Sequence, residues 1–333
     1  MASAHLRVVD AYPGSPPLPV FRHKAPTRLA ESIEPTGAVN DGGVRRLVRA
    51  VRAALDSAHS QHVAEPIPIA TSAVRDAANR DDIVKVLDAE TGIRVGFLSG
   101  DDEARLTYFA AHRWYGWSTG ALLLLDIGGG SMEIAQGRDE DPTMVVSLPL
   151  GAGRLTRSHL PEHPANRAQV KALRRYVRDA LAPVAERLTW EPRTGHPVAT
   201  SKTFKQLARL AGTTVGEPPD QRLLLRRDDL RPWLGRLAAM SPRERAALPG
   251  ISAPRARQIL AGAIVAEAAM ATLGVPHVEI CPWALREGIL LRRLSPLLTA
   301  DSLYQISLIQ AAADPDVVIL DNHRGRGLPA SGH

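Results

Sequence analysis

Residues 123–137, LLLDIGGGSMEIAQG, decide the fold of this chain of 333 residues. An apolar strand ends in Asp126, the glycines turn the chain, and an alternating second strand follows. Glycines without side chains let backbone N–H groups converge on an anion, and a serine hydroxyl adds a donor. We therefore predict an antiparallel hairpin whose turn binds a phosphate group. The predicted loop consists of Gly128, Gly129, Gly130 and Ser131.

Two common phosphate loops do not fit this stretch. A Walker A loop needs Gly-Lys-Ser/Thr at the start of a helix, and a dinucleotide fingerprint also leads into a helix. A plain tight hairpin is the simpler alternative, but two glycines suffice for it and it needs no aspartate. A carboxylate beside a phosphate site is unfavourable unless it holds a cation or orients water. We expect Asp126 and Glu133 to hold Mg²⁺, a hard cation that takes oxygen ligands.

The composition is that of an ordinary globular protein. Hydrophobic residues make up 44% and charged residues 23%, which excludes collagen-like, coiled-coil and disordered classes. The single cysteine, Cys281, excludes an internal disulfide and a cysteine-rich zinc site. No apolar run is long enough to span a bilayer and no signal peptide is evident, so we expect a cytoplasmic protein without a membrane partner.

Positive charge is concentrated in the second half of the chain. Residues 1–150 have a net charge of −4, whereas residues 151–333 have a net charge of +10. Arginine accounts for 36 of the 41 cations and suits bidentate phosphate contacts. This asymmetry indicates an anionic partner, although a GC-rich genome is an alternative cause of the arginine excess.

Strands and helices alternate in the first half, which favours an α/β fold, and the second half becomes more helical. We expect a first domain at residues 1–120 and a second at 121–298. A last helix near 283–295 is expected to return to the first domain. Residues 299–333 are expected to form a polar tail.

The hairpin resembles the second phosphate motif of the actin-like ATPase superfamily, and more closely that of the Ppx/GppA family of exopolyphosphatases and guanosine pentaphosphate phosphatases. Further segments in the family order resemble its motifs, and two of them, RWYGW and CPW, are similar to actinobacterial-type exopolyphosphatases. These segments are ATSAVRDA (70–77), SGDDEARL (99–106), RWYGW (113–117), PRAR (254–257), CPW (281–283) and ALREG (284–288).

The resemblance implies an actin-like, ribonuclease H-like duplicated fold with the active site between two domains. It implies hydrolysis of terminal phosphoanhydride bonds of inorganic polyphosphate, with Glu103 as the general base that orients water. From the residues alone, Glu103 is also explained as an acid favoured by the helix dipole. Arg75 follows a Thr-Ser turn and could clamp a phosphate, or it could simply pair with Asp76. Guanosine pentaphosphate is the alternative substrate.

Two further positions could bind phosphate at helix N-termini. Gly153 lies in Gly151-Ala152-Gly153-Arg154, just before a helix, and Lys202 lies in Thr200-Ser201-Lys202-Thr203. Related proteins have glycines at the positions of Ala199 and Lys202. Bulk and charge there are expected to hinder nucleotide docking and to favour a polyphosphate chain.

The first phosphate motif of the family, Asp-x-Gly-Ser-Asn-Thr, has no counterpart here. The spacing of Ser3 and Arg28 echoes that of Ser131 and Arg154, as expected of a duplicated half that lacks its opening strand and loop. We expect a start codon upstream of Met1; the alternative is a truncated, inactive or regulatory paralogue.

Three other expectations remain open. Residues 248–259 resemble a DNA-binding helix-hairpin-helix, but Ser252 replaces its second glycine and no basic cluster follows, so nucleic acid is not the expected partner. A nucleotide-sugar or acetate-type kinase on the same superfamily fold is a further alternative. A homodimer is compatible with the sequence.

Overall fold

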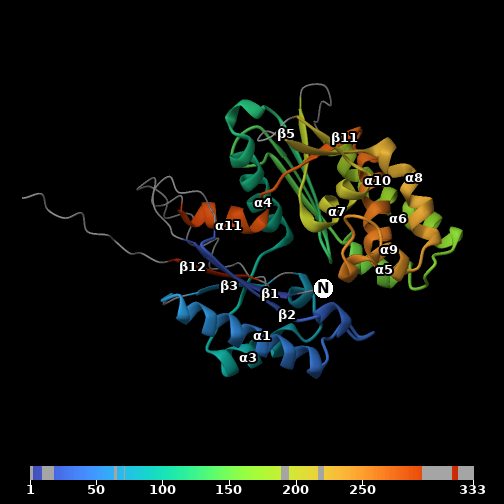
Figure 1. Cartoon of the computed structure of the whole chain (residues 1–333). Helices are drawn as coiled ribbons and strands as arrows, with labels where there is room; N and C mark the ends of the chain where they lie inside the picture. The colour runs from blue at the N-terminus through green and yellow to red at the C-terminus, as the bar shows by residue number, and fades with distance from the viewer. Residues whose placement is uncertain are drawn as a thin grey trace, which may run out of the picture. The chain divides into compact units, whose positions relative to one another are not determined.

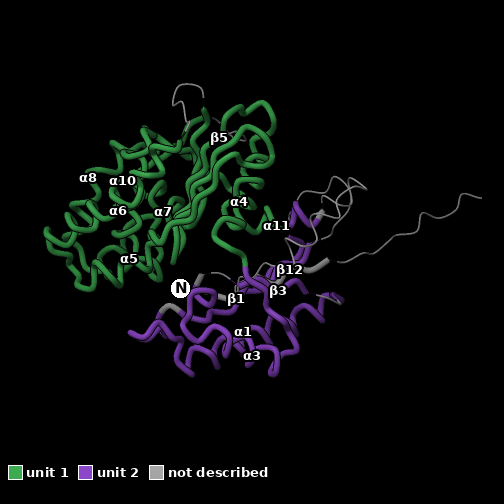
Figure 2. The backbone as a smooth tube through the Cα atoms, turned by 180° about the vertical axis from the view of Figure 1, so that it is seen from behind, with its two compact units in different colours: residues 1, 98–289 green, residues 2–97, 290–333 purple. Residues whose placement is uncertain are grey.

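The computed structural model describes residues 3–9, 19–63, 66–70, 72–188, 195–216, 221–294 and 317–321. The chain divides into two compact units (Figures 1 and 2). Unit 1 is built on residues 98–289, and unit 2 on residues 2–97 and 290–333. Within the described residues, no helix combines the length and the apolar character that crossing a bilayer requires.

Unit 1 contains a seven-stranded sheet with the order β7-β6-β5-β8-β11-β10-β9. Strands β5, β6 and β7 are antiparallel neighbours, whereas β8 is parallel to β5 and β11 is parallel to β8. This order of three antiparallel strands followed by two parallel ones is that of the actin-like, ribonuclease H-like fold. The strands are β5 (Leu122–Ile127), β6 (Met132–Gly137), β7 (Met144–Leu148), β8 (His196–Ala199), β9 (Thr213–Val215), β10 (Arg222–Arg226) and β11 (His277–Ile280).

Helices cover both faces of β5, which explains why this strand is a continuous apolar run. On one face, Leu123, Leu125 and Ile127 belong to the large core built with α5, α6, α7 and α10. On the other face, Leu122 and Leu124 pack in a cluster with Tyr108 of α4. The helices of unit 1 are α4 (Gly100–Tyr115), η2 (Trp117–Thr119), α5 (Ala152–His159), α6 (Arg167–Arg187), α7 (Ser201–Ala211), α8 (Arg227–Ala239), α9 (Pro242–Ala246), η3 (Ala253–Arg255) and α10 (Ile259–Thr272); α11 (Leu285–Leu294) begins in unit 1 and ends in unit 2.

The division between the units differs from the predicted boundary at residue 120. Helix α4 contacts β5, β6 and β7, so it belongs to unit 1 and the division falls between residues 97 and 98. Sequence patterns place the helix correctly but do not show which sheet it covers. Residues from 290 onward are assigned to unit 2.

Helix α10 is buried from Ile259 through Met270. A helix that is apolar on all sides lies inside a protein rather than on its surface. It follows the segment 248–259 that resembles a helix-hairpin-helix, and its apolar residues belong to the large core of unit 1.

Unit 2 contains a five-stranded sheet with the order β2-β1-β12-β3-β4. Helices α1 and α3 pack together beside it, and their apolar residues form its main core cluster. The elements of unit 2 are β1 (Ser3–Val9), β2 (Phe21–Pro26), η1 (Leu29–Glu31), α1 (Asp41–Ser60), β3 (Pro66–Ala70), α2 (Ser72–Arg75), α3 (Arg80–Thr91), β4 (Gly96–Phe97) and β12 (Val317–Asp321).

Residues 317–321, which were expected to lie in a polar tail, form strand β12, and their sequence VVILD is rich in residues that favour strands. Strand β12 occupies the position in this sheet that β5 occupies in the larger sheet. Its direction is reversed, however: β12 is parallel to β1 and antiparallel to β3, whereas β5 is antiparallel to β6 and parallel to β8. The remaining tail residues lie outside the described part of the chain.

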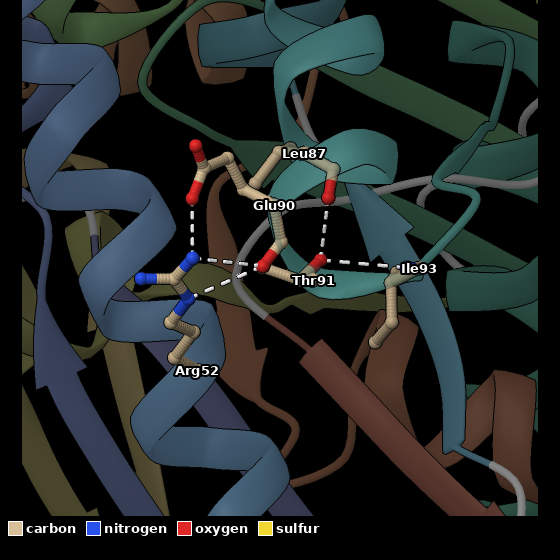
Figure 3. A network of polar contacts seen from close by, with 5 residues as sticks. All are labelled: Arg52, Leu87, Glu90, Thr91 and Ile93. Atoms are coloured by element: carbon tan, nitrogen blue, oxygen red, sulfur yellow. Dashed lines mark hydrogen bonds and ion pairs between the residues drawn. The ribbon is translucent and has the colours of Figure 1, made fainter.

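A polar network fixes the end of α3 to α1 in unit 2 (Figure 3). The Arg52 guanidinium of α1 donates to the carbonyl of Glu90 from Nε (3.2 Å) and Nη2 (3.0 Å) and also binds the Glu90 carboxylate. The Thr91 hydroxyl donates to the Leu87 carbonyl at 2.6 Å and accepts from the Ile93 N–H at 3.4 Å. The arginine thus satisfies a carbonyl that the helix end leaves free and complements the helix dipole.

Arg245 in α9 is a fully buried cation held by carbonyl groups. Its Nε donates to the Leu237 carbonyl at 2.8 Å, and Nη1 reaches the carbonyls of Ala256 (3.5 Å) and Arg257 (3.4 Å). Burial lowers the pKa of Arg245 to about 10. Arg245→Leu should therefore lower the free energy of unfolding by about 3 kcal/mol, because it removes these buried hydrogen bonds.

Denaturant unfolding measures this loss, with Arg243→Leu as the control because Arg243 is exposed on the same helix. Equal unfolding free energies for the two variants would show that the buried guanidinium is not a structural link.

Candidate active site

A row of polar side chains crosses four strands of unit 1 where β5 ends. Asp126 is the Cα partner of Glu133, and Glu133 is the partner of Ser147. Leu125 pairs with Ala199, so Thr200 follows at the level of Asp126. Paired residues on neighbouring strands point to the same face of a sheet. The four side chains therefore lie side by side on the face that α4 covers.

Asp126 is held by the start of α7. The Thr200 hydroxyl donates to Asp126 Oδ2 at 2.5 Å. Burial raises the pKa of Asp126, while this hydrogen bond and the charges of Arg255 and Lys205 act in the opposite direction. The positive charges of Arg255 and Lys205 thus stabilise the ionised carboxylate of Asp126 at the end of β5.

Glu133 is 4% exposed and accepts a hydrogen bond from the Ser147 hydroxyl at 3.0 Å. Two carboxylates directly opposite each other on neighbouring strands repel, unless a cation lies between them or one is protonated. Within the described ranges, no group of three or more His, Cys, Asp or Glu side chains is arranged to hold a metal ion. Asp126 and Glu133 are two ligands at most, which suits Mg²⁺, because that ion takes one or two carboxylates together with substrate phosphates.

The loop 128–131 is tied to the start of α5 through its carbonyl groups. The N–H groups of Ala152 and Arg154 donate to the carbonyls of Gly128 (3.0 Å) and Gly129 (2.9 Å). The Gly130 carbonyl accepts from the N–H of Gly151 (3.3 Å) and from Arg154 Nε (2.9 Å). The carbonyl groups are thereby held in place on the side of α5.

The N–H groups of this loop, unlike its carbonyl groups, are mostly not hydrogen-bonded within the described residues of the protein. The Gly128 N–H closes the turn onto the Ser131 carbonyl at 2.9 Å. Across the part of the chain that the structure describes, the N–H groups of Gly129, Gly130 and Ser131 donate to no protein acceptor. Neighbouring backbone N–H groups without acceptors form the kind of nest that binds anions. The loop thus has donors for an anion, and its binding of a phosphate group stays a prediction.

Two glycines of the following turn allow this packing. A Cβ at Gly151 would fall on backbone atoms of Gly130 and Ser131, and one at Gly153 would lie 3.0 Å from the Gly129 carbonyl oxygen. The close approach to that carbonyl explains why residue 153 is a glycine. The binding of phosphate by Gly153 stays a prediction.

Helix α4 begins beside the same row. Gly100, its first residue, packs so closely on Ser147 that a Cβ would overlap the Ser147 hydroxyl. Ser99 caps the helix by accepting from the Asp102 N–H at 3.1 Å. Glu103 lies one turn after Gly100, on the same side of the helix, and is 9% exposed. Glu103 is thus an acid in the first turn of α4 that is also buried, and its role as general base stays a prediction.

The start of α7 completes the described part of the site. The Thr203 hydroxyl donates to the Ile127 carbonyl at 2.9 Å, and Ser201 adopts a left-handed φ of 71°. Lys202 lies in the first turn and is exposed. The sequence indicated Lys202 as a site residue but did not indicate the hydrogen bond from Thr200 to Asp126. That bond depends on the register between β5 and β8, which the sequence does not reveal.

Arg75 belongs to unit 2. It ends α2 and forms an ion pair with Asp76 at 3.1 Å, with 16% of its side chain exposed. The structure thus contains the pair with Asp76, while the side chain is mostly buried rather than freely solvated. The clamp on a phosphate stays a prediction. All other predicted site residues lie in unit 1.

Comparison with known proteins supports the resemblance. The sequence profile of the Ppx/GppA phosphatase family matches residues 8–296. The chain belongs to the Ppx/GppA phosphatase family. Exopolyphosphatase 1 of Mycobacterium tuberculosis is 43% identical over 311 residues, which cover 93% of this chain and 90% of that protein. The protein of the same name from Mycobacterium leprae is 43% identical over 92% of this chain and 91% of its own length.

Solved structures of Ppx/GppA proteins have the same fold. An exopolyphosphatase from Cytophaga hutchinsonii has a TM-score of 0.74 at 21% identity and covers 88% of this chain and 98% of its own. A family member from Aquifex aeolicus has a TM-score of 0.70 at 21% identity, with coverages of 90% and 99%. The chain is thus a member of a phosphatase family with the expected actin-like α/β fold.

Proposed function

We propose that this Ppx/GppA protein is an exopolyphosphatase, which hydrolyses terminal phosphoanhydride bonds of inorganic polyphosphate and releases orthophosphate. The observation that carries the proposal is the loop 128–131, whose unused N–H groups lie next to the carboxylates of Asp126 and Glu133. The names of the mycobacterial relatives support polyphosphate as the substrate.

In this proposal, the N–H groups of Gly129 and Gly130, with the N–H and hydroxyl of Ser131, hold a phosphoryl group. Such donors neutralise charge that develops as the phosphoryl group is transferred. Glu103 orients the attacking water and accepts its proton. The proton of the water then lies on Glu103, and its hydroxyl group becomes part of the released orthophosphate. The shortened polyphosphate chain leaves as the other product.

Asp126 and Glu133 are the residues that would hold Mg²⁺. When bound, Mg²⁺ neutralises the negative charge of phosphate oxygens and helps to orient them. Arg75 is proposed to clamp a phosphate with its guanidinium group, whose Nε pairs with Asp76.

Lys202 supports polyphosphate over guanosine pentaphosphate. Its charge at the start of α7 matches a chain of phosphates, and its bulk stands where a nucleotide would need a glycine. The test is kcat/KM for orthophosphate release from each substrate with Mg²⁺. We expect polyphosphate to give the higher value; a higher value for guanosine pentaphosphate would favour the alternative activity.

Ser147→Ala provides a separate test of the metal site. The variant removes the hydroxyl that holds the Glu133 carboxylate but preserves space for Gly100. Loss of a group that orients a metal ligand typically weakens metal affinity about tenfold or more. We therefore expect the Mg²⁺ concentration for half-maximal activity to rise about tenfold.

Thr143→Ala is the control, since its hydroxyl binds the Gln136 carbonyl on the same pair of strands, away from the carboxylates. An identical Mg²⁺ dependence of Ser147→Ala and the wild type would contradict the assignment of Glu133.

A further inference from the structure

A basic groove lies between α6 and α8 in unit 1, apart from the candidate active site. Helix α10 packs against both helices (Figure 1 shows the three together). The volume of the groove is about 1130 Å³. This exceeds the volume of most small-molecule pockets and suits an extended ligand.

The groove carries an excess of positive charge. It is lined by five cationic side chains and a single acidic one, Asp228. Four of the cations are on α6, and Arg167 and Arg178 at the two ends are eleven residues apart. A helix rises 1.5 Å per residue, so these cations extend over about 16 Å. The five cations are Arg167, Lys171, Arg174, Arg178 and Arg231.

Most of this charge is available to a ligand. Arg167, Lys171 and Arg178 are exposed, and none of them forms an ion pair with an acid among the residues that the structure describes. Arg174 binds the buried carboxylate of Glu267 on α10 at 2.7 Å, which fixes the middle of the groove. An ordinary solvated helix face would have acids interspersed with its cations and would not border a recess.

The lining also indicates the class of ligand. Val170, Leu234 and small residues form the apolar part of the walls, and no lining residue is aromatic. Proteins that bind single-stranded nucleic acid combine a basic groove with aromatic side chains on which bases stack. A row of cations without such a platform fits a polyanion that has no bases.

We propose that the α6–α8 groove is a second binding site for inorganic polyphosphate, which holds the chain away from the end that is hydrolysed. The inference rests on the proposed function, because it takes polyphosphate as the substrate. Arginine and lysine side chains on successive turns would contact phosphates at intervals along one extended chain. Long chains can reach both sites, whereas tripolyphosphate is too short to occupy the groove and the active site together.

The test uses a groove variant, in which Arg167, Lys171 and Arg178 are all replaced by Gln. The affinity of the protein for fluorescently labelled long-chain polyphosphate is measured in EDTA at several salt concentrations. We expect the groove variant to bind about tenfold more weakly at low salt, because three ionic contacts are lost. The slope of log affinity against log salt concentration should decrease in magnitude by about 2. The kcat/KM for tripolyphosphate should not change.

A matched variant keeps the net charge equal to that of the groove variant. In it, the exposed residues Arg175, Arg187 and Arg243, which do not line the groove, are replaced by Gln. We expect this variant to bind long polyphosphate nearly as the wild type does. Equal weakening of both variants would overturn the proposal, because it would reduce the effect to net charge.

Two further outcomes are distinguishable. A single-stranded DNA oligonucleotide that binds the wild type more tightly than polyphosphate, and loses affinity in the groove variant, would also overturn the proposal and identify a nucleic-acid site. If polyphosphate binding depends on the groove but no orthophosphate is released, the proposed binding site is supported. That result would contradict only the proposed hydrolytic activity.

Discussion

Glu103→Gln should lower kcat for orthophosphate release from polyphosphate by about 10² to 10⁴-fold. The amide has the size of the carboxylate and fits the buried position at the start of α4, but it cannot accept a proton from water. The binding of polyphosphate should be nearly unchanged, because the loop 128–131 and the basic residues are untouched. Steady-state kinetics and a binding isotherm separate the two effects.

Asp101→Asn is the matched control for this variant. Asp101 lies in the same first turn of α4, but it is exposed. Both substitutions remove one negative charge from the helix N-terminus, so they share any effect on helix stability through the dipole. We expect Asp101→Asn to retain the wild-type kcat. A similar kcat for the two variants would refute the role of Glu103 in orienting water.

Gly151→Ala should reduce activity about 10²-fold while leaving every proposed catalytic side chain in place. Its methyl group would collide with the backbone of Gly130 and Ser131, and it would lie 2.5 Å from the carbonyl carbon of Gly129. Backbone atoms cannot move aside as a flexible side chain can, so the loop has to shift. The unfolding temperature should also fall, because the bonds between the loop and α5 weaken.

Gly129→Ala is the control for Gly151→Ala, because it adds a methyl group to the same loop region without a steric collision. A Cβ at Gly129 meets no atom within 4 Å, and its φ is not in the left-handed region. This variant should unfold at the wild-type temperature. The packing account would be wrong if Gly151→Ala also unfolded at the wild-type temperature and retained activity within about twofold of wild type.

The larger sheet could be predicted from its central hairpin. The leucine run of β5, the glycine turn and the alternating β6 determine two strands and their direction, and the family resemblance supplies the order of the others. Strand β12 could not be predicted, because a short apolar segment within a polar stretch gives no information about a partner more than 240 residues away in the sequence. Contacts across such distances depend on tertiary packing rather than on local pattern.

The site was predictable where its residues are close in sequence. Asp126, the loop and Glu133 lie within one hairpin, so their proximity follows from the antiparallel pairing. Thr200 and Ser147 come from strands that join this hairpin later in the chain, and their bonds to Asp126 and Glu133 depend on register. Arg255 lies in a short turn between α9 and α10, where no periodic pattern indicates that its charge acts on Asp126.

The most direct test of the central proposal is to follow long-chain polyphosphate by ³¹P NMR during incubation with the purified protein and Mg²⁺. We expect the orthophosphate signal to grow from the start, at the expense of the chain, without fragments of intermediate length, and we expect this growth to be lost in Glu103→Gln. An unchanged polyphosphate spectrum, or fragments of intermediate length in place of orthophosphate, would contradict the assignment of this chain as an exopolyphosphatase.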